Sequence, residues 1–410
     1  MDKSESKKQK VLIVHNYYQI PGGEDTVVAN EKKMLEEHGH EVILYSRHNS
    51  ELKEMNKLQK FFLPIDTIFN LKTYREIKTI VKKEKIDIVH VHNTLNLISP
   101  SVYYASRACN VPVVQTIHNF RLLCPGATFY RDGHICEDCV GYSLYCAVKH
   151  KCYRNSRIQT LACVVSTKFH RLTGIYGKIN YICLTEFNKE KLLELKQIQK
   201  DMVFVKPNFV ESDGKIIPVE KRENRFIFVG RLDKLKGVDI MLEAWKQIGK
   251  DAPELMICGT GAMEEWCKDF IQDNKINNVK MLGFVPNQEI RKLVAYSKAL
   301  ILPTQWYEGF PMSIAESFSV GTPVLCSDLG NSGNLVIDGI NGFKFKFDSS
   351  IGLIESVEQL CNCFKIYEET LNDYKSKYTE EHNYKILKKF IGWQNNKGIS
   401  KNPLFKSSKM

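Results

Sequence analysis

The sequence has no long hydrophobic run. None of its apolar stretches approaches the ~20 residues that a membrane-spanning helix needs. The start, MDKSESKKQK, is charged and leads directly into VLIVHN, without the apolar core and small-residue cleavage site of a secretion signal. We therefore expect a cytoplasmic chain, in which the thirteen cysteines are mostly reduced and packed as small hydrophobes.

Basic residues are in excess, but they form no stripe interleaved with aromatic residues. The formal net charge of +11 suits an anionic ligand or an anionic membrane surface, and a solvated lysine-rich exterior explains it equally well. Because the lysines are spread along the chain, we expect no nucleic-acid partner. The length of 410 residues exceeds one ordinary core and predicts two domains.

Two series of short apolar runs alternate with helical stretches. The first begins at KVLIVHN and continues through EVILYS, KIDIVHVHN and VPVVQTIHN. The second begins at RFIFVGRLD and includes ELMICGTG, KALILPT and TPVLCSD. Strands separated by helices of ten or more residues indicate parallel sheets with right-handed crossovers. The prediction is an α/β protein with two Rossmann-like domains.

The domain boundaries follow from this pattern. An N-terminal domain is predicted over residues 1–208, with a cysteine-rich insert at about 121–155. Residues 209–224 carry charges, Pro and Gly without periodicity and form the expected linker. A C-terminal domain is predicted over 225–380, and residues 381–410 are expected to hold a basic helix and a polar tail.

Three glycine-containing loops follow predicted strands, where ligands of open parallel sheets bind. QIPGGEDT places Gly23 at a helix N-terminus suited to anions or hydroxyls. VGRLDKLKG carries Arg231 and Lys236, which suit a diphosphate. CGTGAMEE places Gly259 at a strand end but lacks the third glycine of a dinucleotide fingerprint, which disfavours nicotinamide. Plain turns and a solvated basic loop remain alternatives, but together the loops indicate a nucleotide in an interdomain cleft.

The stretch YEGFPMSIAESFSVGTPVLCSD places two glutamates, Glu308 and Glu316, on either side of Gly-Phe-Pro. Taken with GRLDKLKG, it resembles family 4 of the glycosyltransferases, retaining enzymes with the GT-B fold, in which two Rossmann-like domains face a cleft. PGGEDTVVANEKKMLEEHGHEV, VHVHN, QTIHNF and KPNFV match further motifs of the family, so the resemblance covers nearly the whole chain.

The resemblance implies transfer of a sugar from a nucleotide-sugar donor to a glycan or polyprenyl-linked glycan acceptor. Bacterial relatives of this size often build capsule, O-antigen or exopolysaccharide at the inner face of the membrane. The N-terminal domain would bind the acceptor and the C-terminal domain the donor, and the helix within 381–410 would return toward the N-terminal domain. Alternatives are a GT-B epimerase, a phosphorylase or a non-catalytic nucleotide-sugar-binding scaffold.

The donor-side residues are also implied by the resemblance. Glu308 would bind hydroxyls of the donor sugar, and Glu316 would accept hydrogen bonds from the ribose. Between them Phe310, Pro311 and Met312 would face the donor, with backbone N–H groups directed at the sugar and phosphates. A helix N-terminus supplies unsatisfied donors and a partial positive charge for this purpose.

The reacting centre is implied in the same way. Arg231 and Lys236 would neutralise the departing diphosphate. His118, at the end of a predicted strand, would orient hydroxyls or support the oxocarbenium-like transition state. No carboxylate nucleophile is evident on the acceptor side, so we expect same-face substitution. No Asp-x-Asp motif stands out, and no cofactor or metal ion is expected to be required for catalysis.

Five of the thirteen cysteines crowd into residues 124–152. Cys136 and Cys139 form a C-x2-C pair, the usual opening of a tetrahedral zinc site. With Cys124 and Cys152 they provide four candidate ligands for a structural zinc ion, with Cys146 or His134 as a ligand in reserve. Only one such pair is present, so reduced, partly buried thiols are the alternative.

The stretch over residues 61–83, FFLPIDTIFNLKTYREIKTIVKK, is apolar at its start and lysine-rich at its end. Such a segment can lie on an anionic membrane, which would suit a lipid-linked acceptor at the inner face of the cell membrane. The alternative is an amphipathic helix packed on its own sheet.

Overall fold

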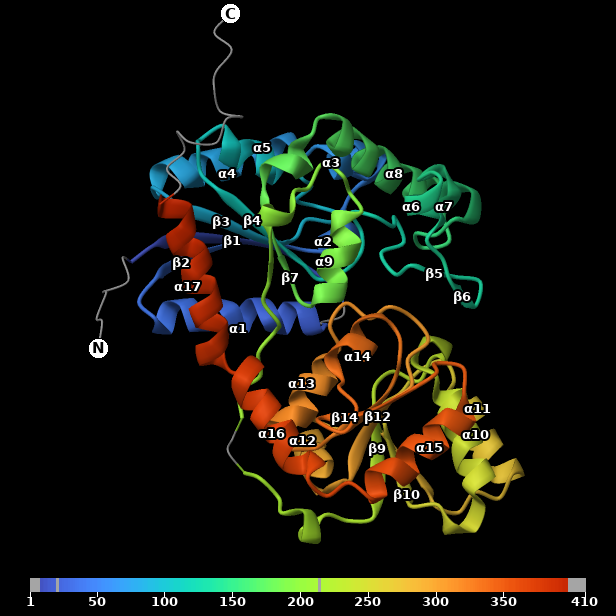
Figure 1. Ribbon diagram of the computed structural model, residues 1–410. Coiled ribbons are helices and arrows are strands. Elements are labelled where there is room, and N and C mark those ends of the chain that lie inside the picture. Colours follow the sequence, from blue (N-terminus) through green and yellow to red (C-terminus); the bar gives the residue numbers. More distant parts are fainter. Residues whose placement is uncertain (1–7, 20–21, 213–214, 397–410) are drawn as a thin grey trace, which may run out of the picture.

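The computed structural model describes residues 8–19, 22–212 and 215–396. Two α/β units lie one above the other, each with a parallel sheet between helices (Figure 1). The tail predicted at the C-terminus falls in 397–410, outside the described residues. The predicted fold class of two Rossmann-like domains is therefore confirmed.

The N-terminal sheet has six parallel strands in the order β2-β1-β3-β4-β7-β8. These strands are β1 (Lys10–Tyr17), β2 (Glu41–His48), β3 (Ile88–Asn93), β4 (Val113–Ile117), β7 (Asn180–Cys183) and β8 (Val203–Val205). Its helices are α1 (Gly23–Glu37), α2 (Glu51–Glu54), α3 (Lys57–Ile68), α4 (Leu71–Lys83), α5 (Ser101–Arg107), α8 (Arg157–Leu172) and α9 (Glu186–Leu193). Helices lie above and below the sheet in Figure 1, so its central strands are buried on both faces.

An insert lies between β4 and α8. It consists of a two-stranded antiparallel hairpin followed by two short helices. Its elements are β5 (Tyr130–Arg131), β6 (His134–Ile135), α6 (Asp138–Gly141) and α7 (Tyr145–His150). The insert projects beside the upper domain and toward the lower one in Figure 1.

The C-terminal sheet repeats the pattern in the order β11-β10-β9-β12-β13-β14, again parallel. These strands are β9 (Arg225–Val229), β10 (Glu254–Cys258), β11 (Val279–Gly283), β12 (Ala299–Leu302), β13 (Val324–Ser327) and β14 (Gly342–Phe345). The helices are α10 (Val238–Ile248), α11 (Glu264–Asp273), α12 (Asn287–Tyr296), α13 (Met312–Ser319), α14 (Gly330–Leu335), α15 (Ser350–Cys361) and α16 (Ile366–Lys377). The apolar runs of β12 and β13 are buried at every position, as a covered parallel sheet requires.

The last helix, α17 (Glu380–Asn396), packs on the N-terminal domain. The ring of Tyr384 stacks on His38 at 3.5 Å between centroids, and its hydroxyl lies 3.0 Å from Nε2 of His40. Asn383 accepts a hydrogen bond of 3.0 Å from the buried Nζ of Lys206. The chain therefore crosses between the domains and returns, which ties them at a second place.

The segment proposed to contact a membrane forms two helices rather than one. Asn70 caps α4 by accepting a hydrogen bond from the backbone of Thr73, and α4 buries Ile77 and Val81 in the N-terminal core. The alternative of packing on its own sheet is therefore correct for α4, whereas α3 keeps its apolar side chains exposed. Within the described ranges, no helix has both the length and the apolar character to cross a membrane.

Candidate active site

The ends of two strands meet across the domain boundary. His118 follows β4 of the N-terminal domain, and Gly309 lies between β12 and α13 of the C-terminal domain. A Cβ atom on Gly309 would lie 2.0 Å from the carbonyl oxygen of His118, so only glycine permits this approach. A Cβ on Gly23 would lie 3.4 Å from Cγ of Met312, which brings the first glycine loop to the same place.

Three polar side chains hold this junction. Nδ2 of Asn188 donates to the carbonyl oxygen of Gly309 at 3.0 Å. Asn331 donates to the carbonyl oxygens of Glu308 and Gly309, and its own oxygen accepts from Thr185. The sequence analysis did not predict these contacts. Thr185 directly follows the strand run INYICL, so its polar side chain at a strand end could have marked it as a site residue.

Glu308 is held by three donors on one carboxylate oxygen. Oε1 lies 2.6 Å from Nζ of Lys236, 3.0 Å from Oγ1 of Thr304 and 3.0 Å from Nε1 of Trp306. The Glu308 side chain is only 10% exposed, so these bonds fix its position. A carboxylate has about four acceptor sites, which leaves capacity for a sugar hydroxyl.

Arg231 and Lys236, the two cations predicted to bind the diphosphate, differ in exposure and in how firmly they are held. Lys236 is fixed by Glu308 and by the short 3-10 turn Lys234–Lys236, whose cap Asp233 accepts from the backbone of Lys236. Arg231 is 71% exposed, and its guanidinium lies 3.3 Å from Asp233. The loop thus presents one anchored and one movable positive charge. Their binding of a diphosphate stays a prediction.

Glu316 lies on α13, and burial raises the pKa of its carboxyl, while the nearby Arg291 acts in the opposite direction. The helix begins at Met312 after Pro311 as its N-cap. Phe310 packs beside Tyr378 at 6.5 Å between ring centroids. Of the predicted donor residues, Phe310, Pro311, Met312 and Glu316 therefore lie in one turn and the helix that follows it.

Gly259 has a φ of +144°, and a Cβ there would lie 1.8 Å from the carbonyl oxygen of Gly230. Close approach of two strand-end loops therefore requires this glycine. A direct contact between Gly259 and a donor stays a prediction.

His118 is paired with a second histidine that the sequence analysis did not single out. Nδ1 of His92 lies 2.9 Å from Nε2 of His118, and burial lowers the pKa of both imidazoles well below the usual range. Nε2 of His92 is buried without a partner. Orphaned buried N–H groups are rarer in proteins than under-satisfied acceptors, which favours the tautomer of His92 that donates from Nδ1 to His118. His118 then carries its own proton on Nδ1.

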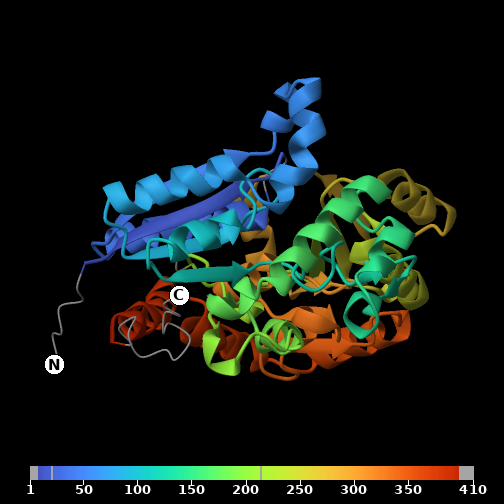
Figure 2. The same cartoon turned by 90° about the horizontal axis from the view of Figure 1, so that it is seen from above.

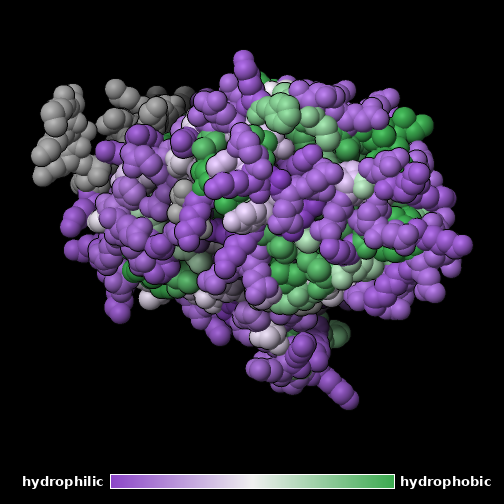
Figure 3. Space-filling view, turned by 90° about the horizontal axis from the view of Figure 1, so that it is seen from below, coloured by the Kyte–Doolittle hydropathy of each residue, from purple (hydrophilic) through white to green (hydrophobic). Residues whose placement is uncertain are grey.

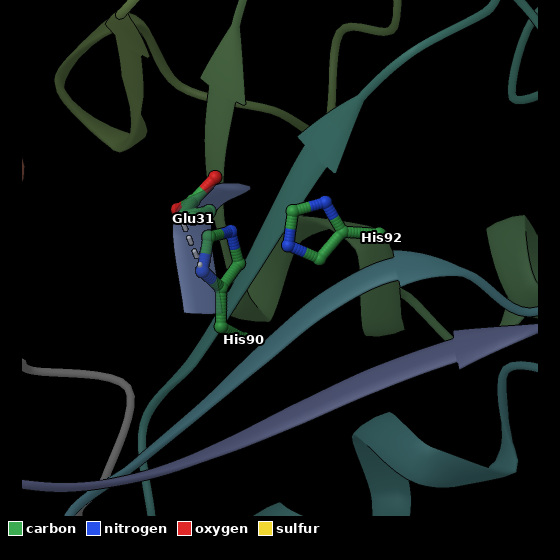
Figure 4. A group of neighbouring side chains, drawn as sticks. All are labelled: Glu31, His90 and His92. Atoms are coloured by element: carbon green, nitrogen blue, oxygen red, sulfur yellow. Dashed lines mark ion pairs between the residues drawn. The ribbon is translucent and has the colours of Figure 1, made fainter. Parts of the chain in front are cut away.

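Glu31, His90 and His92 offer three possible metal ligands within 4.8 Å of one another (Figure 4). However, Nζ of Lys206 lies 3.5 Å from Oε2 of Glu31 and is fully buried. Nδ1 of His90 lies 3.2 Å from Oε1 of the same carboxylate, and its Nε2 lies 2.8 Å from Oγ1 of Thr116. The ammonium already supplies a cation here, so the group is better described as a buried polar network.

Glu24, in the first turn of α1, is a largely buried acid that the sequence analysis missed. Burial raises the pKa of its carboxyl to about 8, and the hydroxyl of Tyr18 donates to it at 3.0 Å. The neighbouring Asp25 also raises this pKa, whereas Arg121 lowers it. Glu24 therefore holds a proton over much of the neutral range.

A small pocket of about 80 Å³ adjoins His118 in the N-terminal domain. The ends of β3 and β4 line it with His92, Asn119 and Arg121, and α3 and α8 line it with Thr67 and Ser166. This pocket is the candidate acceptor site. The four predicted zinc ligands lie in the insert nearby and are free thiols.

Comparisons with known proteins agree with this arrangement. A family profile described as "Glycosyltransferase Family 4" matches residues 21–135, and one described as "Glycosyl transferases group 1" matches residues 210–378. A solved glycosyltransferase from Rickettsia africae aligns with a TM-score of 0.70 and 16% identity, covering 96% of this chain and 100% of that chain. The protein is thus a glycosyltransferase with the GT-B fold. Both profiles describe glycosyltransferases, and retention of anomeric configuration is typical of the family 4 enzymes that the N-terminal domain matches.

Two curated relatives are similar over most of their lengths. The UDP-Gal:alpha-D-GlcNAc-diphosphoundecaprenol alpha-1,3-galactosyltransferase of Escherichia coli is 23% identical, over 86% of this chain and 88% of its own. An uncharacterized 42.6 kDa protein in the cps region of Klebsiella pneumoniae is 23% identical, over 73% of this chain and 74% of its own. The family and these relatives favour sugar transfer over the epimerase, phosphorylase and scaffold alternatives.

Proposed function

We propose that this enzyme transfers a sugar from a nucleotide-sugar donor to a polyprenyl-linked glycan at the inner face of an anionic cell membrane, during assembly of a cell-surface polysaccharide. The relative from E. coli acts on a diphosphoundecaprenol-linked sugar, and the relative from K. pneumoniae lies in a cps region. The structural observation that carries the proposal is an apolar surface beside the acceptor pocket.

This surface is formed by α3 and α8, which lie on the upper side of the N-terminal domain (Figure 2). The two helices pack together, with Oγ of Ser166 donating to the carbonyl oxygen of Thr67. Their large exposed apolar side chains are Leu58, Phe61, Phe62, Ile65, Ile158, Leu161, Val165, Phe169 and Leu172. So many exposed apolar side chains on adjacent helices are typical of a surface that meets a membrane or another protein.

Charge favours an anionic lipid surface as the partner. α3 carries exposed Lys57 and Lys60 and a single acid, Asp66, and α8 carries Arg157 and Lys168 and no acid. Basic residues near an anionic bilayer are each worth about 1 kcal/mol. By contrast, the face seen from below is mostly hydrophilic, with hydrophobic residues in separate patches (Figure 3).

The same helices wall the acceptor pocket. Thr67 of α3 and Ser166 and Thr167 of α8 line it together with His118. A membrane-bound glycan whose lipid stays in the bilayer would therefore reach the pocket when these helices rest on the surface. His118 would then lie between the acceptor sugar and the donor held near Glu308.

The experiment is vesicle flotation with phosphatidylglycerol-containing and pure phosphatidylcholine vesicles. The wild type is expected to float with the anionic vesicles and to lose this at high salt. The double variant Phe61→Ser with Ile158→Ser should not float, whereas Phe284→Ser, at an 80% exposed site in the C-terminal domain, should behave as wild type.

A transfer assay completes the test. The double variant should lose transfer to a vesicle-borne lipid-linked acceptor and keep transfer to the same acceptor dispersed in detergent. Flotation of wild type and both variants alike, or equal loss of transfer in detergent, would contradict a role of α3 and α8 in membrane contact.

A further inference from the structure

The insert brings cysteines from three separate pieces of backbone into one region. Cys124 follows β4, Cys136 follows the hairpin, Cys139 lies in α6 and Cys152 follows α7. The point that a Cβ on Gly126 would occupy lies 3.7 Å from Sγ of Cys124 and 3.4 Å from Cβ of Cys152. Cys124 and Cys152, which are far apart in sequence, therefore lie on either side of this glycine.

Two of the thiols share one small apolar cluster in the insert. Cys139 is buried there with Leu144, Ala147 and Val148, and Cys152 packs against the same cluster. Thiols gathered in this way disfavour one another's ionised form, and a divalent cation among them reverses that repulsion.

The backbone of the insert needs a constraint that its small core does not supply. Of ten described non-glycine residues with positive φ, six lie here: Ala127, Phe129, Asp132, Lys151, Arg154 and Asn155. Such conformations cost on the order of 1 kcal/mol each and persist only where the surroundings fix them. The hairpin strands have two residues each and the two helices only four and six. Segments this short are commonly held by disulfides or a metal ion.

The charges around the thiols also fit a metal centre. Four thiolates around Zn²⁺ carry a net charge of about −2, which needs partial compensation nearby. The guanidinium of Arg131 pairs at 3.1 Å with Asp138, which directly precedes the proposed ligand Cys139. It therefore supplies positive charge at the edge of the thiol group.

We propose that Cys124, Cys136, Cys139 and Cys152 bind one Zn²⁺ ion as tetrahedral thiolate ligands, releasing their four protons. Among the described residues, no three of these sulfur atoms lie within 4.8 Å of one another. Binding therefore draws the side chains inward through their rotamers. The soft ligand set and the C-x2-C pair select Zn²⁺ over Mg²⁺ or Ca²⁺.

The zinc site would stabilise the turn that carries Tyr307 and Glu308. Phe129, fully buried between the first two ligands, lies 6.1 Å from the ring of Tyr307, and Glu137 accepts a hydrogen bond from the same tyrosine. Nζ of Lys191 in α9 lies 2.7 Å from Glu137. Since Tyr307 directly precedes Glu308, zinc in the insert fixes the position of the turn that carries Glu308.

The test is elemental analysis of the full-length protein, purified under reducing conditions without chelator. We expect one zinc and no iron per chain, and four thiols that resist alkylation until the protein is denatured. Cys136→Ser should lose the zinc, and Cys146→Ser, a partly buried thiol in the same insert, should keep it. These readouts are independent of sugar transfer and so of the proposed donor and acceptor.

A second measurement covers the case in which Cys136→Ser fails to fold. Chelation of the wild type should lower its unfolding midpoint and raise hydrogen exchange in the peptide 303–312, and Zn²⁺ but not Mg²⁺ should restore both. Metal-free protein with all cysteines open to alkylation would overturn the proposal. Bound iron, detected by its visible absorption, would contradict zinc as the metal. Zinc loss in Cys146→Ser equal to that in Cys136→Ser would contradict the proposed set of four ligands.

Discussion

The carbonyl oxygen of His118 lies only 2.0 Å from the position that a Cβ on Gly309 would occupy. The two residues come from different domains. The turn that carries Glu308 and Gly309 is therefore in direct backbone contact with the candidate catalytic histidine. Asn188 and Asn331 fix the same turn through its carbonyl oxygens. The reacting geometry of this enzyme therefore depends on a closed domain boundary.

Gly309→Ala should open that boundary. The added methyl would meet a backbone carbonyl that cannot rotate away, so the domains must separate. We expect the rate of transfer to fall by about a hundredfold, because misplacement by ~1 Å costs on that order. Each domain keeps its own core, so thermal unfolding should change little.

Gly141→Ala is the matched control, since nothing lies within 4 Å of its added methyl. Steady-state kinetics of both variants gives the comparison. Unchanged kcat and KM in Gly309→Ala would show that the closed boundary is not needed for transfer.

His92→Phe tests the assignment of the His118 proton. The phenyl ring keeps the packing and removes the N–H that His92 donates to His118. His118 would then lose its preference for the tautomer with the proton on Nδ1. We expect kcat to fall about tenfold or more with little change in the KM for donor.

Nitrogen chemical shifts of the His118 imidazole report the tautomer directly. In wild type they should show the proton on Nδ1, and in the His118→Ala background His92→Phe should add no further loss. A wild-type proton on Nε2 of His118 would refute the assignment.

Lys236→Ala should weaken donor use strongly. It removes the anchored positive charge expected at the diphosphate and leaves Glu308 without its closest partner at 2.6 Å. We expect kcat/KM to fall by roughly 10²–10³, equivalent to about 3–4 kcal/mol of transition-state stabilisation.

Lys234→Ala is the control for Lys236→Ala because Lys234 is an exposed lysine of the same 3-10 turn. It should retain nearly wild-type kinetics. Equal effects of the two substitutions would mean that the loop contributes only general positive charge.

Glu24 should make the stability of the fold depend on pH. Its pKa is about 8 in the folded protein and near the ordinary value of 4.5 when unfolded. The folded state therefore binds the extra proton between these values, and the stabilisation present at low pH is lost as pH rises through about 8.

Urea unfolding between about pH 5 and pH 9 measures this loss, and Glu24→Gln should flatten the profile. Glu36→Gln, on an exposed part of the same helix, should leave the profile unchanged. Parallel profiles for wild type and Glu24→Gln would contradict a protonated Glu24 in the folded protein.

Much of the fold was predictable because each buried strand and the polar loop that follows it are adjacent in the sequence. Buried strands such as RFIFV end in polar loops, and parallel topology brings those ends to one edge of each sheet. The family motifs then assigned Glu308, Glu316 and His118 to the cleft. The sequence analysis missed Asn70, the cap that divides α3 from α4.

Other features depend on tertiary packing and leave no periodic signal. Thr185, Asn188 and Asn331 become a network only when the domains meet, and their spacing along the chain is arbitrary. The raised pKa of Glu24 comes mainly from burial, which an acid directly after a glycine pair does not reveal. The pairing of His92 with His118 likewise requires adjacent strands to be in register.

The most direct test of the central claim is nucleotide binding, measured by thermal unfolding with UDP, GDP, ADP or no nucleotide. One nucleotide, at a hundred times its Kd, should stabilise the protein by about 2.7 kcal/mol. This shift should disappear in Glu316→Ala and in Lys236→Ala. No shift with any of the three nucleotides, or a shift that both variants retain, would contradict a donor site at this domain boundary.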